Sequence, residues 1–211
     1  WLIMDWKELF GSDSEEEENE ERTEIPGLTL VRQALDHTQQ MAMTNAIIEK
    51  KYFFGEVNQA MCFGELPSYL SWLSQWVIDE CPDMFNTDIL NREPLFDQAI
   101  LNLYKKGEGI CSHVDLLRFE DGILIVSLLS SCVMTLKEIA TGTIIDILLN
   151  PGDILSLSGE SRYQWEHGIK EQLFDTIDDQ LIERGTRISV TLRKLKPGST
   201  EIAATSTSSR Y

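Results

Sequence analysis

Two histidines and one aspartate have the residue types and the spacing of a metal site. His113 and Asp115 form a His-x-Asp pair at the end of a predicted strand, and His167 follows 54 residues after His113. Two imidazoles and one carboxylate can occupy one face of an octahedral Fe(II) ion and leave three positions open. No thiolate stands in the set, which suits iron better than structural zinc. The alternative is a loop hydrogen bond between His113 and Asp115, with His167 a satisfied, half-buried histidine.

A strand near the carboxyl end could anchor an acidic cosubstrate for such an iron site. Arg187, Ser189, Thr191 and Arg193 alternate along the chain, so they share one face of an extended strand. A guanidinium fork binds a carboxylate through two parallel hydrogen bonds. Two inward arginines without a ligand would be a costly pair of buried charges. The alternative is an edge strand whose polar face lies in water.

The elements that would position these residues are short strands preceded by two helices. Asp36 can cap a helix that extends to about residue 50, and Pro67 can occupy the first position of a second helix. Short β-rich runs separated by turn residues then predict a sandwich or barrel with helices packed outside. The predicted strands are 28–31, 99–104, 110–113, 123–129, 133–136, 143–149, 154–157 and 188–195.

Charge and composition divide the 211 residues into three parts. Residues 1–25 carry ten acids and two bases, and we expect them to form an acidic disordered tail. Residues 196–211 are rich in Ser, Thr and Ala, which predicts a second disordered tail. Residues 26–195 are then one folded domain. The total net charge of -17 argues against broad, sequence-independent binding to DNA or RNA, because such binding depends on Lys and Arg.

The sequence also indicates where the protein works. It has no run of 18 apolar residues, which predicts that it does not span a membrane. The first residues do not have the pattern of a secretory signal, and the four cysteines lack paired spacing. We therefore expect an intracellular protein of the nucleus and/or cytoplasm, and we expect a monomer.

The order of the candidate residues resembles that of AlkB-type Fe(II)/2-oxoglutarate-dependent dioxygenases, nearest to the eukaryotic AlkB homologues. The similarity covers about residues 26–195, and the stretch Gly159–Gly168 is particularly similar to eukaryotic relatives, including the tRNA-modifying branch. The joint pattern is specific, whereas any one piece is not. The matching pieces are Asn102-Leu103-Tyr104, Gly107-Glu108-Gly109-Ile110, His113-Val114-Asp115, His167 and Arg187 to Arg193.

The resemblance implies a mostly β (α+β) fold of the double-stranded β-helix type, which is a jelly-roll barrel. It implies Fe(II), 2-oxoglutarate and O2 as cofactor and cosubstrates. Arg187 would pair with the distal carboxylate of 2-oxoglutarate, and Ser189 replaces the Asn of the family's Arg-x-Asn-x-Thr-x-Arg motif. Arg193 would lie near the cosubstrate or on the substrate side of the pocket. The implied catalytic iron ligands are His113, Asp115 and His167; the implied cosubstrate-binding residues are Asn102, Tyr104, Arg187, Ser189, Thr191 and Arg193.

Three hypotheses about the substrate remain open. The resemblance favours an N-methylated or otherwise modified base in nucleic acid such as tRNA or DNA, which residues 50–64 would cover after extrusion. Their aromatic residues, Tyr52, Phe53, Phe54 and Phe63, could stack on a base, although such residues are more often core. The charge favours a hydroxylase or demethylase of histones or other basic proteins, because the unit without its tails still carries -10. The third hypothesis is a non-catalytic binding barrel.

Overall fold

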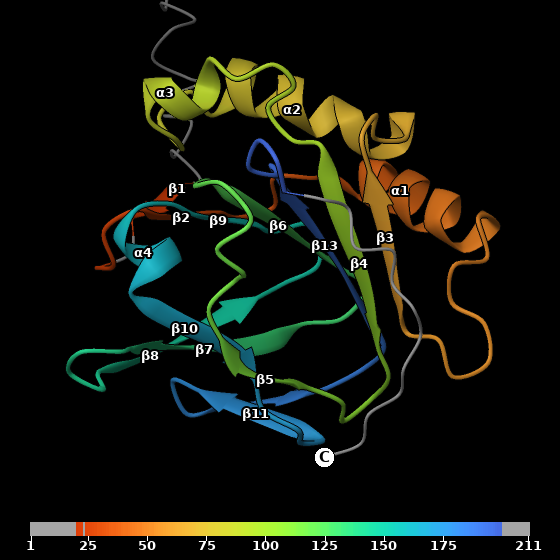
Figure 1. The fold of residues 1–211 in the computed structure, drawn as a ribbon. Coiled ribbons are helices and arrows are strands. Elements are labelled where there is room, and N and C mark those ends of the chain that lie inside the picture. Colours follow the sequence, from red (N-terminus) through yellow and green to blue (C-terminus); the bar gives the residue numbers. More distant parts are fainter. Residues whose placement is uncertain (1–19, 23, 200–211) are drawn as a thin grey trace, which may run out of the picture.

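Two antiparallel sheets form the body of the protein, with the two long helices on the outer face of the larger sheet (Figure 1). The structure is a computed structural model that describes residues 20–22 and 24–199. The larger sheet contains, in spatial order, β1 (Glu20–Arg22), β2 (Leu28–Val31), β9 (Ile154–Leu157), β6 (Ile123–Leu128), β13 (Arg187–Arg193), β4 (Gln98–Tyr104) and β3 (Gln59–Phe63). The smaller contains β5 (Ile110–His113), β10 (Trp165–Ile169), β7 (Cys132–Glu138) and β8 (Ile144–Leu149). β11 (Phe174–Ile177) and β12 (Gln180–Glu183) form a separate hairpin.

Two apolar layers hold the sheets and helices together. One lies between the two sheets and includes Leu30, Ile125 and Leu136. The other lies between the helices and the larger sheet, and includes Ile188 and Val190 of β13. Because side chains alternate along a strand, the intervening residues of β13 face the space between the sheets. The predicted jelly-roll class, mostly β with helices outside, is confirmed.

The helices begin near the residues that the sequence predicted. α1 (His37–Glu49) starts after Asp36, whose side chain accepts from the amide of Gln39 in a capping box. α2 (Ser68–Glu80) starts one residue later than predicted, because Pro67 is the residue before the helix rather than its first position. Two short helices complete the set, α3 (Thr87–Leu90) and α4 (Glu160–Tyr163).

Several strands were not predicted, each for a local reason. β3 pairs only with β4 at the sheet edge, and its residues are exposed or half-buried, so apolar and polar positions do not alternate. β10 contains Glu166 and Gly168, which interrupt the apolar pattern. β11 and β12 are joined by Asp178 and Asp179, both with positive φ, and this hairpin lies outside the two main sheets.

The folded region extends beyond the predicted boundaries at both ends. β1 pairs with β2, and Ile25 is buried in the layer between the sheets, although both fall in the segment assigned to the acidic tail. At the other end, the Lys196 amide donates to the Arg118 carbonyl oxygen. Residues 1–19 and 200–211, which make up most of the predicted tails, lie outside the described residues. None of the helices described is long and apolar enough to cross a membrane.

Candidate metal centre and cosubstrate pocket

The two candidate histidines are direct neighbours across the smaller sheet. His113 is the last residue of β5 and pairs in register with His167 on β10, with ring centroids 4.5 Å apart. Asp115 follows two residues after β5, and one ligand atom from each of these three residues lies within 4.8 Å of the others. The nearby Gly109 allows this pairing, since a Cβ there would lie 2.1 Å from the Ile169 carbonyl oxygen. Two segments distant in sequence, residues 113–115 and His167, therefore converge on one point.

Both imidazoles can offer a ring nitrogen to a metal. The Nδ1 atom of His113 lies 2.9 Å from the Cys111 carbonyl oxygen, which can only accept a hydrogen bond. In the neutral tautomer that fits this contact, Nδ1 carries the proton and Nε2 offers its lone pair to a metal. Burial lowers the pKa of His167 to about 4, and the neighbouring Asp115 opposes this only in part. His167 is therefore neutral near pH 7.

The carboxylate of Asp115 stays ionised although it is buried. Burial by itself raises its pKa, but the attraction of Arg193 and His167 outweighs burial and brings the pKa below the usual 3.8. Arg193 donates directly to Oδ1, while Oδ2 lies 3.5 Å from Nε2 of His167. The sequence predicted that Arg193 lies near the cosubstrate or on the substrate side of the pocket. In the structure its side chain contacts Asp115, which is a proposed metal ligand.

Arg187 is the second buried cation of this pocket, and its hydrogen bonds are incomplete. It is 1% exposed, and its Nε donates to Oγ of Ser127 at 2.9 Å. One terminal nitrogen, Nη2, is buried without a hydrogen-bond partner among the described residues. β13 is a central strand, so the alternative of an edge strand with its polar face in water is wrong. A buried, half-satisfied guanidinium fits a carboxylate ligand.

The remaining predicted residues lie on β13 and β4, which are paired neighbours in the larger sheet. Tyr104 pairs in register with Arg187, whose guanidinium carbon is 5.5 Å from the tyrosine ring centre. Asn102 pairs with Ser189 and accepts a hydrogen bond from Gln59. Burial raises the pKa of Tyr104, although Arg187 opposes this. Thr191 is buried and lines the same cavity of about 180 Å³ as the three candidate ligands.

Four residues of this site were not predicted from the sequence as functional. Ser127 and Gln98 accept from Arg187 and Arg193, respectively, and Gln59 donates to Asn102. Arg162 donates to the backbone of Asp115. Only Arg162 had a sequence signal, since it lies in the stretch that resembles eukaryotic AlkB relatives. The other three come from neighbouring strands whose pairing the sequence did not reveal.

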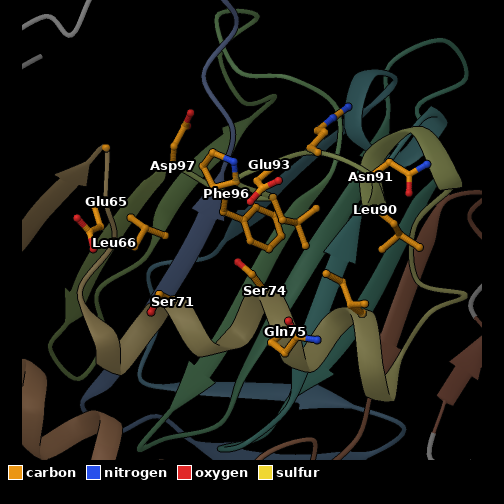
Figure 2. A pocket seen from close by; sticks show the side chains of 15 residues that line it. Glu65, Leu66, Ser71, Ser74, Gln75, Leu90, Asn91, Glu93, Phe96 and Asp97 are labelled. Atoms are coloured by element: carbon orange, nitrogen blue, oxygen red, sulfur yellow. The ribbon is translucent and has the colours of Figure 1, made fainter.

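A larger cleft of about 850 Å³ lies away from this chemistry, between α2 and residues 91–97 (Figure 2). Figure 2 shows Ser74 and Gln75 on the helix side and Glu93 and Phe96 on the opposite side. Its lining contains no histidine or cysteine. The larger cleft is therefore not the candidate catalytic site, despite its size.

The segment expected to cover an extruded base is only partly free to do so. Its second half contains strand β3, which is hydrogen-bonded to β4. Tyr52 and Phe53 pack against the helix layer, and the Tyr52 hydroxyl lies 2.8 Å from that of Tyr69. Phe54 is 79% exposed and is available for an external contact. Two of the four aromatic residues are thus packing residues.

Fold and site together define an oxygenase of the class that uses iron(II) and 2-oxoglutarate. The chain belongs to this family: the family model described as the 2OG-Fe(II) oxygenase superfamily matches residues 27–193. The expected cofactor set of Fe(II), 2-oxoglutarate and O2 is confirmed as that of the family.

Individual relatives agree with the AlkB resemblance. The chain is 38% identical over 117 residues to the tRNA (carboxymethyluridine(34)-5-O)-methyltransferase ALKBH8 of Macaca fascicularis, covering 47% of this chain and 18% of that protein. It is 32% identical over 153 residues to the Alkylated DNA repair protein ALKBH8 homolog of Arabidopsis thaliana, covering 63% and 43%. The chain thus spans less than half the length of these relatives. The solved structure of OsALKBH1 shares the fold, with a TM-score of 0.59, 16% identity, and coverage of 82% of this chain and 100% of that chain.

Proposed function

We propose that this protein is an Fe(II)/2-oxoglutarate-dependent dioxygenase whose iron is held by His113, Asp115 and His167. The observation that carries the proposal is the convergence of their ligand atoms within 4.8 Å, in one cavity with Arg187. Two imidazoles and a carboxylate leave three positions of an octahedral ion open for other ligands. The completeness of this set argues against a non-catalytic barrel.

The residues of the pocket bind and orient, and the bound iron with 2-oxoglutarate and O2 supplies the oxidation of a substrate C–H bond. Arg187 binds the distal carboxylate of 2-oxoglutarate through Nη2, which has no hydrogen-bond partner among the described residues. The adjacent strands β4 and β13 supply the residues that shape and polarise the cosubstrate pocket. They are Tyr104 and Asn102 on β4, and Ser189 and Thr191 on β13. Arg193 keeps Asp115 ionised and fixes its orientation.

The substrate we propose is an N-methylated or otherwise modified base in nucleic acid such as tRNA or DNA. Relatives whose names refer to tRNA carboxymethyluridine and to alkylated DNA support this choice. A local observation agrees with it. Two arginines, Arg187 and Arg193, line the cavity, whereas Asp115 is the one carboxylate among its described lining residues, so the cavity is electropositive inside an acidic chain. Such a site attracts an anionic substrate more than a basic one.

Oxidation of a basic protein, such as a histone, is the second candidate. It is favoured by the charge of -10 that remains on residues 26–195. An acidic exterior attracts Lys- and Arg-rich chains over distances of about 8 Å at physiological salt. The two candidates thus draw on different parts of the molecule, the pocket and the outer surface.

A parallel succinate-release assay separates these candidates. Purified protein with Fe(II) and 2-oxoglutarate is offered modified and unmodified oligonucleotides, including tRNA anticodon stem-loops, and methylated and unmethylated histone peptides. We expect succinate release to rise above the substrate-free level only with a modified nucleic acid. Stimulation by peptides alone would transfer the assignment to a protein substrate. Absence of any 2-oxoglutarate turnover, with iron bound, would refute the dioxygenase proposal.

A further inference from the structure

A buried arginine outside the ligand set contacts the backbone that carries Asp115. Arg162 lies on α4 and is 1% exposed. One terminal nitrogen donates to the Asp115 carbonyl oxygen at 2.9 Å, and the other donates to that of Leu116 at 3.0 Å. α4 leads directly into β10, so Arg162 belongs to the segment that carries His167.

No carboxylate among the described residues forms a direct ion pair with the buried Arg162. Its Nε has no hydrogen-bond partner among these residues either. The guanidinium carbon of Arg162 also lies 4.8 Å from the centre of the Tyr163 ring. Burying a charge without a partner costs free energy. A residue whose burial destabilises the fold needs a compensating role. The two carbonyl contacts of Arg162 indicate that this role is at the loop that carries Asp115.

The loop that Arg162 contacts is held at its two ends, by the ion pair of Asp115 with Arg193 and by the hydrogen bond of Lys196 to Arg118, but packing is sparse between them. Asp115 lies beyond the end of β5, outside the regular hydrogen bonds of the sheet. The next two residues, Leu116 and Leu117, are 59% and 66% exposed, so their side chains contribute little packing. The chain becomes buried again at Phe119, whose amide donates to the same Leu116 carbonyl oxygen that accepts from Arg162. Arg162 therefore binds the loop at the point where packing is weakest.

We propose that Arg162 is a positioning residue for the metal-binding carboxylate. It connects the segment leading to His167 with the loop carrying Asp115, so the two ligands keep a common geometry before metal arrives. Arg193 fixes the Asp115 carboxylate from the side, and Arg162 fixes its backbone. This inference rests on the proposed metal site, but it assigns Arg162 a task separate from cosubstrate binding.

The test compares Arg162→Met and Arg162→Lys with the unaltered protein. Mn(II) serves as the probe, and its dissociation constant is measured by electron paramagnetic resonance of the free ion. We expect Arg162→Met to weaken Mn(II) binding by about tenfold or more, the range seen when outer contacts of metal ligands are removed. Arg162→Lys keeps the charge and can reach one carbonyl, so its affinity should lie between the two. At saturating Mn(II), affinity for 2-oxoglutarate should stay within about twofold, since only the ligand geometry is affected.

A second readout needs no metal. Hydrogen exchange of the Phe119 amide should be faster in the metal-free Arg162→Met protein, because the loop has lost its anchor. Arg32→Met is the matched control: Arg32 also donates to a backbone carbonyl, that of Leu148, but it does not line the metal cavity. This variant should leave Mn(II) affinity and Phe119 exchange unchanged.

The possible results distinguish the positioning role of Arg162 from the proposed metal site on which it rests. Unchanged Mn(II) affinity in Arg162→Met would overturn the positioning role. So would parallel losses of Mn(II) affinity, 2-oxoglutarate affinity and thermal stability, because these would indicate general structural damage. If Arg162→Met does not fold, intermediate Mn(II) affinity in Arg162→Lys supports the role, and unaltered affinity in that variant overturns it. A parent protein that binds no Mn(II) would instead refute the proposed metal site.

Discussion

Arg193 donates a hydrogen bond to the Asp115 carboxylate, which joins the last residue of the central strand β13 to the loop after β5. Both side chains are buried, and the guanidinium also stacks 3.9 Å from the centre of the Phe119 ring. A proposed iron ligand is thus also one partner of a buried ion pair. This arrangement keeps Asp115 ionised in a buried place, and it gives the pair a role in stability as well as in metal binding.

Arg193→Met should destabilise the metal-free protein by about 3 kcal/mol, because removing one partner of a buried ion pair leaves an uncompensated charge. Urea denaturation gives this value. The double variant Arg193→Met with Asp115→Asn should lose less than the sum of the single variants, since the two residues interact directly. Additive losses would show that the pair contributes no coupling energy.

His113→Ala should lower Mn(II) affinity by more than about 100-fold, because it removes a direct ligand rather than an outer contact. Iron-dependent 2-oxoglutarate turnover should disappear with it. Isothermal titration with Mn(II) checks the first result, and succinate release checks the second. His37→Ala on α1 is the matched control, since His37 is not among the residues that line the metal cavity. Equal effects of both substitutions would contradict the ligand assignment.

Arg187→Lys should weaken 2-oxoglutarate binding by about tenfold or more while leaving Mn(II) affinity unchanged. Lysine keeps the charge but loses the planar fork that binds a carboxylate through two hydrogen bonds. Binding of 2-oxoglutarate to the Mn(II)-loaded protein measures the effect. Arg92→Lys, at the larger cleft, provides the control. An unaltered 2-oxoglutarate affinity in Arg187→Lys would remove Arg187 from the cosubstrate site.

The buried His167 predicts a pH dependence of stability in the metal-free protein. Its pKa is about 4 in the folded state and 6.5 as the ordinary value, so the unfolded chain binds more protons between these limits. Stability therefore falls as pH decreases from 6.5 toward 4. Between pH 7 and pH 5, His167 should account for a loss of about 2 kcal/mol.

Urea denaturation at both pH values, with and without His167→Asn, isolates this contribution. The substituted protein should lose less stability than the parent over the same interval. Saturating Mn(II) should also flatten the dependence, because a coordinated imidazole cannot take up the proton. Identical slopes for the parent and His167→Asn would contradict the low pKa.

Two N-terminal truncations should behave differently. Deletion of residues 1–19 should leave the melting temperature unchanged, whereas deletion of residues 1–25 should lower it. The longer deletion removes β1 and the buried Ile25, whose burial contributes about 2 kcal/mol. Calorimetry distinguishes the two, and equal melting temperatures would show that β1 and Ile25 contribute nothing to stability.

The shorter truncation also tests the acidic segment as a contact for basic partners. Residues 1–25 hold a net charge of -8, most of it before β1. Binding to histones should weaken on deletion of residues 1–19, most at low salt, because exposed charges are screened beyond about 8 Å at physiological ionic strength. Succinate release without substrate should not change. Equal histone binding before and after deletion would show that residues 1–19 do not contribute to binding histones.

The residue types alone determined the class of chemistry. His113, Asp115 and His167 have the residue types of a ligand set for a first-row metal, and Arg187 is suited to a carboxylate because of its guanidinium geometry. The alternation of Arg187, Ser189, Thr191 and Arg193 placed them on one strand face, since side chains in a strand have a period of two. Helix positions followed from Asp36 and Pro67 to within a residue, because capping chemistry is local.

Only the tertiary structure decided which residues meet. The register of β5 against β10 places His113 opposite His167, and the register of β13 against β4 places Arg193 opposite Gln98. Strand register depends on contacts between distant segments, so no local pattern in the sequence encodes it. The same reason explains why Arg193 was expected at the cosubstrate or substrate yet pairs with Asp115, and why Arg162 had no assigned role. Both contacts join residues more than 40 positions apart, and they exist only because the sheets and loops bring those segments together.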